Sequence, residues 1–171
     1  MSWLRLPDGF PAGDAATLAA TGLRLRALAP DTLVLVDGLA FGAMPDLAAE
    51  LAARLRLVAL VHHPLGLETG LDPATAAAWI ERERRALCHA ERIVVTSAMT
   101  GATLSAELGV PPERITIAVP GTDPAPLARG GAGPATALLA VGSVIPRKDF
   151  ATLTRPRESA RRSRPTASRD G

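Results

Sequence analysis

Between residues 31 and 118, short runs rich in Val, Leu and Ile alternate with longer segments rich in Ala and charged residues. This order is typical of parallel strands joined by helices that cover the sheet. We therefore predict an α/β fold, a Rossmann-like parallel sheet with flanking helices. The expected strands are 32–36, 57–61, 92–96 and 115–118, and a later strand is expected at 136–141.

Local signals mark the ends of the expected helices 45–56, 73 to about 90, and 98–108. Pro45 stands at a helix start, where its missing N–H is tolerated. Asp72 before Pro73 is an N-cap pattern, and Ser97 is a second N-cap candidate. Gly109 then ends the last helix.

The distribution of charge argues against a nucleic-acid partner. The six arginines and two acidic residues after residue 150 give that segment a formal charge of +4. Because the whole chain has a formal net charge of +2, residues 1–150 carry a charge of −2. No basic stripe interleaved with aromatic residues lies outside this tail, as nucleic-acid binding would require. No apolar run approaches the roughly 20 residues of a membrane-spanning helix, and no basic-then-apolar leader opens the chain. We expect a cytoplasmic protein.

Composition divides the chain into four parts. Residues 1–121 form the first α/β lobe, residues 122–135 have the Pro, Gly and Ala content of a linker, and residues 136–150 begin a second α/β unit. Residues 151–171 are rich in Arg, Ser, Thr and Pro, and we expect this basic tail to be disordered. Lys148 is the only lysine, so the tail also fits an out-of-frame reading of an Arg-biased coding sequence. A frameshifted end and a genuine tail both remain open.

Ligands of open α/β sheets bind beyond the carboxyl ends of the strands. The residues at those ends are therefore the candidate site residues, and Gly among them allows close approach to a phosphate. Two adjacent imidazoles at one strand end are seldom needed for packing, whereas an Asp or Ser there also fits a plain turn or N-cap. The candidates are Asp37-Gly38, His62-His63, Thr96-Ser97, Gly121-Thr122 and Gly142-Ser143.

Metal and nicotinamide chemistry are not expected. His62, His63, Glu68 and His89 do not have the spacing of a zinc motif, and adjacent side chains on a strand point to opposite faces. No G-x-G-x-x-G directly follows a strand. Cys88 lies in a helical pattern and has no second cysteine to pair with, so we expect a small buried hydrophobic residue.

A series of short motifs in a fixed order carries a resemblance to a known family. Together they resemble the family four retaining glycosyltransferases of GT-B fold over about residues 31–149, so a partial GT-B fold is implied. The motifs are Val61–Leu65, Glu68–Gly70, Glu83–Leu87, Ala90–Ser97, Val119–Asp123, Ala140–Ser143 and Arg147-Lys148.

The resemblance implies roles for residues of the first lobe and the hinge. His62 matches the family's His that faces the donor sugar across the cleft, and it is the implied catalytic residue. Ser97 matches a Ser at a strand end and is assigned to donor binding. The family's hinge, usually Pro-Asn-Gly-x-Asp, matches Pro120, Gly121 and Asp123 without the Asn.

The resemblance also implies a diphosphate site in the second unit. Gly142 matches the family's Gly-Arg element, in which Ser143 replaces the Arg, and Lys148 matches its Lys-Gly element, in which Asp149 replaces the Gly. Arg147 supplies the guanidinium that balances charge on a departing diphosphate. The implied donor is a nucleotide-diphosphate sugar, without a separate cofactor or an obligatory metal.

Two parts of the family have no counterpart. The opening strand with its Gly-rich acceptor loop is absent before Asp31, and residues 3–10 read as the end of a second strand. The family's glutamate pair, which holds the nucleotide ribose, would fall beyond Phe150. The implied parent transfers a hexosyl group with retention, and this truncated chain is expected to be inactive alone.

Two readings from other classes stay open. One is a non-catalytic α/β module that binds a partner. The other is a small α/β hydrolase that uses His63 and Glu68, although no G-x-S-x-G elbow supports it. The sequence names neither the donor sugar nor the acceptor, and it leaves the oligomeric state open.

Overall fold

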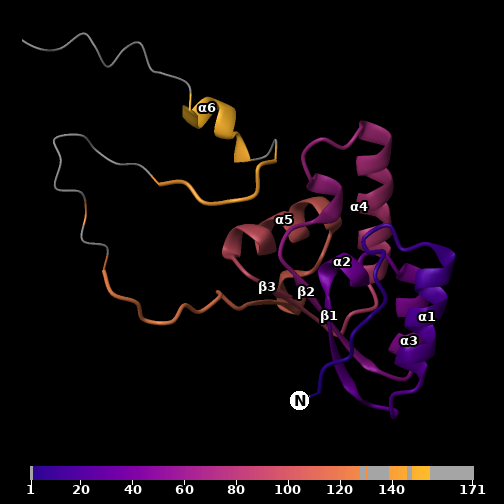
Figure 1. Cartoon of the computed structure of the whole chain (residues 1–171). Coiled ribbons are helices and arrows are strands. Elements are labelled where there is room, and N and C mark those ends of the chain that lie inside the picture. The colour runs from indigo at the N-terminus through magenta and orange to yellow at the C-terminus, as the bar shows by residue number, and fades with distance from the viewer. Residues whose placement is uncertain (1, 128–129, 131–138, 146–147, 155–171) are drawn as a thin grey trace, which may run out of the picture. The chain divides into compact units, whose positions relative to one another are not determined.

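The computed structural model describes residues 2–127, 130, 139–145 and 148–154 (Figure 1). The chain divides into two compact units, residues 1–125 and 126–171.

The first unit is built on one parallel sheet of four strands in the order β1-β2-β3-β4. Every neighbouring pair of strands is parallel. The predicted α/β fold, a Rossmann-like sheet with flanking helices, is therefore confirmed. The strands are β1 (Leu33–Asp37), β2 (Arg56–Val61), β3 (Arg92–Val95) and β4 (Ile115–Ile117).

Helices connect successive strands. Because right-handed connections between neighbouring parallel strands place their helices on the same face when the order does not reverse, the helices gather on one face of this sheet. The described helices and 3-10 turns of this unit are α1 (Ala15–Arg26), α2 (Gly38–Phe41), α3 (Pro45–Ala52), η1 (Leu65–Leu67), α4 (Pro73–Leu87), α5 (Ala98–Leu108) and η2 (Pro112–Arg114). The second unit contains α6 (Phe150–Thr154).

The burial of β1 differs between the two faces of the sheet. Val36 is 5% exposed and belongs to the core, whereas Leu33 and Leu35 on the opposite face are 56% and 55% exposed. The core lies between the sheet and the helices. Its largest fully buried apolar side chains are Phe41, Leu25, Met44, Leu51, Leu57, Leu87, Ile93 and Leu104.

The predicted helix caps are confirmed. Asp72 caps α4 through hydrogen bonds from the backbone N–H groups of Ala74 and Thr75 to its carboxylate, at 3.1 and 3.0 Å. Ser97 accepts from the Thr100 N–H at 3.0 Å and caps α5. Gly109 ends α5 with φ +67°, in the left-handed region that favours glycine.

Removal of the α4 cap should weaken the fold measurably. Asp72→Ala leaves the Ala74 and Thr75 N–H groups without a side-chain acceptor, and we expect the thermal midpoint to fall by roughly 3 °C. Asp72→Asn keeps an acceptor oxygen and serves as the control, with a midpoint close to that of the wild type. Thermal unfolding followed by circular dichroism measures both, and an unchanged midpoint for Asp72→Ala would contradict the cap assignment.

Several predicted boundaries were too long. The helix expected over 45–56 ends at Ala52, because the chain must turn before β2 begins at Arg56. The helix expected to reach about residue 90 ends at Leu87. Cys88 is therefore the exposed C-cap residue of α4, so the expectation that it is buried was wrong.

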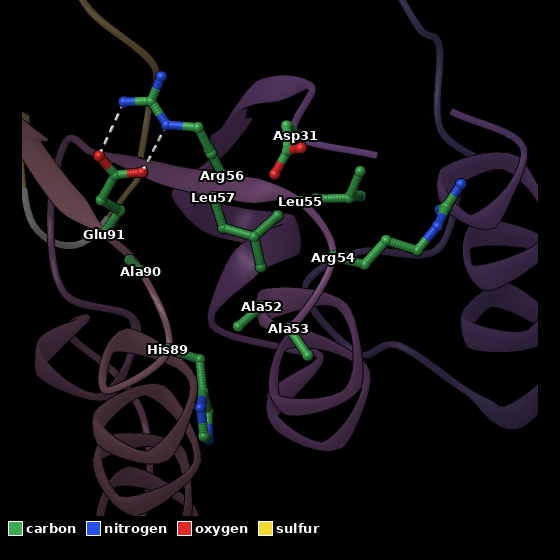
Figure 2. Close-up of a pocket in the computed structure, with 10 residues that line it drawn as sticks. All are labelled: Asp31, Ala52, Ala53, Arg54, Leu55, Arg56, Leu57, His89, Ala90 and Glu91. Carbon is green, nitrogen blue, oxygen red and sulfur yellow. Dashed lines mark hydrogen bonds and ion pairs between the residues drawn. The ribbon is translucent and has the colours of Figure 1, made fainter. Parts of the chain in front are cut away.

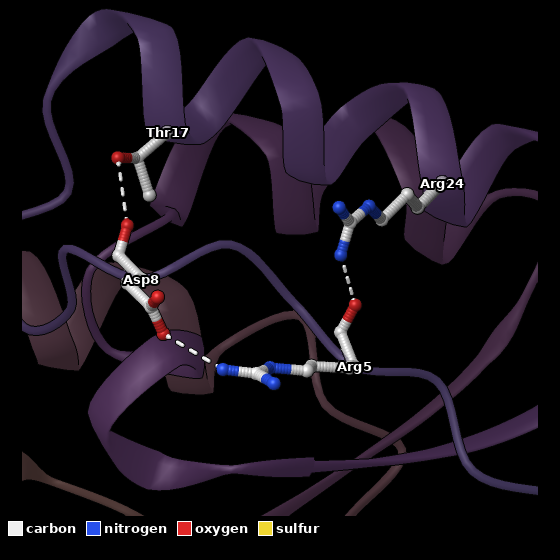
Figure 3. A network of polar contacts seen from close by, with 4 residues as sticks. All are labelled: Arg5, Asp8, Thr17 and Arg24. Atoms are coloured by element: carbon white, nitrogen blue, oxygen red, sulfur yellow. Dashed lines mark hydrogen bonds and ion pairs between the residues drawn. The ribbon is translucent and has the colours of Figure 1, made fainter.

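The segment before the sheet also differs from the prediction. Residues 3–10 form no strand but run along α1, which the sequence analysis did not predict. Figure 3 shows the polar contacts that hold this segment. Thr17 Oγ1 donates to the Asp8 carbonyl at 3.3 Å, Arg24 donates to the Arg5 carbonyl, and the Arg5 guanidinium pairs with Asp8 at 3.6 Å.

In the second unit, the described residues contain the short helix α6, which covers the first four residues of the predicted tail. Residues 139–141 of the strand expected at 136–141 have no regular structure, and residues 136–138 lie outside the described residues. Residues 155–171 of the tail also lie outside them. The predicted boundaries at 121, 135 and 150 therefore stay predictions.

Candidate functional site

The carboxyl ends of the four strands lie along one edge of the sheet. In the register, Val36 lies beside Ala59, Val61 beside Val95, and Val95 beside Ile117. Because the strands are parallel, the residues that follow them share this edge. Asp37, His62 and Ser97 lie at or just after the ends of β1, β2 and β3, so their predicted placement at this edge is confirmed.

Asp37 and His62 face each other across the ends of β1 and β2. The Asp37 Oδ2 atom lies 3.7 Å from His62 Nε2, which is an ion-pair distance but too long for a hydrogen bond. The other oxygen, Oδ1, accepts from the Leu39 N–H at 2.9 Å and caps α2. Both side chains are more than half exposed. Asp37 is thus held by the cap while it faces an accessible imidazole.

Gly38 lets α2 begin directly against β2. A Cβ atom at this position would lie 3.0 Å from the Leu60 carbonyl oxygen and 3.3 Å from the Val61 Cα. A side chain here would push the turn after β1 away from β2. A glycine at position 38 therefore allows α2 to begin close to the end of β2.

Ser97 and Thr100 tie the start of α5 to the histidine segment. The Thr100 hydroxyl lies 2.9 Å from Ser97 Oγ and donates to the His62 carbonyl at 3.4 Å. The Ser97 hydroxyl is occupied by the N-cap, which confirms its expected capping role. Its assignment to donor binding stays a prediction.

His63 and His62 face different acidic residues. The Nε2 atom of His63 lies 3.9 Å from Glu68 Oε2, whereas His62 faces Asp37 on β1. Adjacent residues at a strand end project to opposite sides, as the sequence analysis expected. Within the described ranges, no three His, Cys, Asp or Glu side chains gather where they could hold a metal ion.

Glu83 is a buried carboxylate beneath the segment that carries the histidines. It is 1% exposed, and its Oε2 accepts from the Leu65 N–H at 2.8 Å. Burial raises the pKa of Glu83 to about 7, although hydrogen bonds from the Leu65 and Gly66 N–H groups and the charge of Arg82 act in the opposite direction. A carboxylate that ionises near neutral pH therefore lies directly behind the site.

Glu83 was predicted only as part of the motif Glu83–Leu87, without this role. A signal was present, because Ile80, Ala86 and Leu87 lie three or four positions away and form the apolar stripe of α4. A Glu inside such a stripe is buried, and a buried carboxylate requires hydrogen-bond donors. The identity of those donors, 17 and 18 residues earlier in the chain, was not visible in the local pattern.

The expected hinge residues follow β4. Pro120, Gly121 and Asp123 are exposed and lie in a stretch without regular structure. A Cβ atom on Gly121 would meet no atom within 4 Å, so nothing in the first unit packs against it. The hinge role of these residues stays a prediction.

In the second unit, Gly142 lies beside the side chain of Lys148. A Cβ atom on Gly142 would lie 3.9 Å from the Cδ and Cε atoms of Lys148. The Lys148 N–H donates to the Ile145 carbonyl at 3.0 Å. Gly142, Ser143 and Lys148 are all exposed, and Arg147 lies outside the described residues. The diphosphate site stays a prediction.

A cavity of about 270 Å³ lies at the other end of the sheet, where the strands begin (Figure 2). Its charged lining residues include Arg56 and Glu91, which bind each other through two hydrogen bonds at 2.8 and 3.0 Å. In Figure 2 the Arg54 side chain extends away from His89, and its guanidinium donates to the Leu28 carbonyl. The charges of this cavity serve the fold, and the candidate site remains at the carboxyl edge.

Comparison with known proteins decides what kind of domain this is. The sequence model of Glycosyltransferase Family 4 matches residues 2–126, which cover the whole sheet and its helices. The chain belongs to glycosyltransferase family 4. Comparisons with curated proteins and with solved structures gave no match.

The family assignment covers the edge that carries His62 and Ser97. The matched region ends at residue 126, next to the division between the two compact units at residue 125. The resemblance to family 4 identified in the sequence is thus confirmed over residues 2–126. None of the helices in the described part of the chain is both long and apolar enough to span a membrane.

Proposed function

We propose that this domain is the acceptor-side lobe of a retaining glycosyltransferase of GT-B fold that uses a nucleotide-diphosphate sugar. The observation that carries the proposal is the family match over residues 2–126. The edge of the sheet adds to it, because it presents His62 as an accessible imidazole oriented by Asp37. The second unit supplies the start of the donor-binding lobe in this proposal.

The chemistry requires different contributions from the two lobes. As the bond between the anomeric carbon and the diphosphate breaks, negative charge gathers on the leaving phosphate oxygens. Lys148 and Arg147 in the donor lobe are placed in the sequence to balance that charge. His62 meets the sugar from the acceptor side, so its contribution is made at the reacting end of the donor. No metal is needed if the basic residues neutralise the diphosphate.

We further propose that residues 151–171 result from a shifted reading frame and replace the sequence of the rest of the donor lobe. The coding sequence beyond residue 150, read in the other frames, tests this directly. A continuation that contains a second α/β unit with the glutamate pair supports a glycosyltransferase with a displaced reading frame. The restored protein then provides the enzyme for the assay.

The restored protein should release a nucleoside diphosphate in an acceptor-dependent reaction. His62→Ala should lower kcat by roughly 100-fold while binding of the free nucleoside diphosphate stays nearly unchanged, because that ligand is held by the other lobe. Lys148→Ala should both lower turnover and weaken nucleoside diphosphate binding, because its positive charge pairs with the phosphates.

Steady-state kinetics and calorimetric titration measure these two quantities, and Lys148→Arg is the control that keeps the charge. Full turnover in His62→Ala, or an equal loss of nucleotide affinity in both alanine variants, would refute the division of roles. If the restored protein transfers no sugar from any nucleotide donor tested, the partner-binding module becomes the better interpretation. The anomeric configuration of the product, read by NMR, tests retention.

A further inference from the structure

The backbone that follows His63 rests on a single buried carboxylate. Glu83 lies on α4 and accepts a hydrogen bond from the Leu65 N–H, two residues after His63. The Gly66 N–H adds a second interaction with the same side chain. A Cβ atom on Gly42 would lie 3.2 Å from the Cγ atom of Glu83. The Glu83 side chain therefore fills the space between α4 and the end of α2.

The fit of η1 against α4 leaves the histidine segment little freedom at this point. A Cβ atom on Gly66 would lie 2.7 Å from both the Ala76 carbonyl oxygen and the Ile80 backbone nitrogen. The segment is thus attached at two places. At one, the Thr100 hydroxyl binds the His62 carbonyl, and at the other, Glu83 binds the backbone after His63.

Among the described residues, Glu83 forms no ion pair with a basic side chain. Arg82, its neighbour on α4, donates to the carbonyls of Pro11 and Ala12. On the segment above, His63 faces Glu68. On α3, which also packs against α4, Asp46 pairs with Arg85, and Glu50 pairs with Arg26 of α1. The negative charge of Glu83 is therefore met mainly by backbone N–H groups.

We propose that Glu83 is a positioning residue, whose ionised carboxylate fixes the backbone of residues 65–66 and thereby holds His62 and His63 in place, and whose protonation loosens that segment. The catalytic consequence rests on the proposed function, but the anchoring itself does not. A protonated carboxyl group keeps only one full acceptor oxygen, so at least one of the two N–H groups loses its anionic partner. While Glu83 stays buried, ionisation thus tightens this segment locally, even though burial of the charge lowers the global stability of the fold.

NMR on the uniformly ¹³C,¹⁵N-labelled chain tests the anchor without any substrate. In the wild type, the Glu83 carboxyl carbon and the amide signals of Leu65 and Gly66 should titrate together with one midpoint near neutral pH. Glu83→Gln should abolish this transition at Leu65 and Gly66 and leave the signals of β2 and β3 in place. His63→Gln is the matched control, and it should retain the transition, because the titrating group is Glu83 and not the imidazole.

Hydrogen exchange measures the strength of the anchor. After correction for the intrinsic pH dependence, protection of the Leu65 amide should fall by about tenfold between pH 8 and pH 6 in the wild type, because a hydrogen bond to a charged acceptor is lost. The amide of Ile93, in the centre of the sheet, should show no such change. In Glu83→Gln, the protection of Leu65 should be low and independent of pH.

The outcomes separate this proposal from the proposed function. Leu65 and Gly66 signals that do not follow the Glu83 carboxyl carbon, or Leu65 protection that is equal at pH 6 and pH 8, would overturn the anchor, whatever the enzyme transfers. In the restored enzyme, kcat of the wild type should rise with pH through the Glu83 titration, and this rise should be absent in Glu83→Gln. The same rise in Glu83→Gln would refute the positioning role, even if sugar transfer is demonstrated.

Discussion

Between pH 5 and pH 8, the free energy of unfolding of the wild-type chain should fall by roughly 2–3 kcal/mol relative to that of Glu83→Gln. The pKa of Glu83 is about 7 in the folded chain, against an ordinary value of 4.5. Between these two values the folded state binds the proton more tightly than the unfolded state. This contribution to stability is therefore complete below the lower value and is lost as the pH rises through the higher one. Burial of the charged form is its physical cause.

Urea denaturation at a series of pH values measures this difference. All other ionisable groups are common to both proteins, so their contributions cancel in the comparison. Glu81→Gln is the matched control on the same helix. The hydrogen bond from Arg84 holds the pKa of exposed Glu81 below its ordinary range, so the control should show no pH dependence relative to the wild type above pH 5. Parallel profiles for the wild type and Glu83→Gln would contradict the raised pKa.

Gly66→Ala should lower the free energy of unfolding by about 3 kcal/mol. The added methyl group would lie 2.4 Å from Ile80 Cγ1 and 2.7 Å from two backbone atoms of α4. A flexible side chain can move aside, but the backbone of a helix cannot move without disturbing its hydrogen bonds. We expect η1 to be displaced from α4, and the hydrogen bond from Leu65 to Glu83 to lengthen with it.

Gly121→Ala is the matched control for Gly66→Ala. A Cβ atom there meets nothing within 4 Å, and its backbone does not adopt the left-handed conformation, so its stability should equal that of the wild type. Urea denaturation of the three proteins gives the comparison. If Gly66→Ala were as stable as Gly121→Ala, the close packing of η1 against α4 would be wrong.

The parts of the fold that the sequence predicted correctly are those with local signals. Asp72 before Pro73 and Gly109 after an apolar helix mark their helix ends through contacts within a few residues. The approach of Asp37 and His62 required only the knowledge that parallel strands end at one edge. A topology rule thus located a contact between residues 25 positions apart.

The failures have equally specific causes. Helix α1 has Thr17, Thr21 and Gly22 on its buried face, so it lacks the apolar periodicity that identifies an amphipathic helix. Cys88 followed a helical pattern, but the helix ends one residue before it, and the cap position faces solvent. The hydrogen bond from Leu65 to Glu83 arises from tertiary packing, which no local pattern encodes.

The one-sided packing of β1 has a consequence for a complete mutational scan of this chain scored by folding. Tolerance along the strand should alternate from residue to residue. Val36 lies in the core, so polar substitutions there would be depleted, whereas Leu33 and Leu35 face away from the helices and would accept Thr or Lys at little cost. Leucines usually identify a core in such data, and here they would mark the permissive positions.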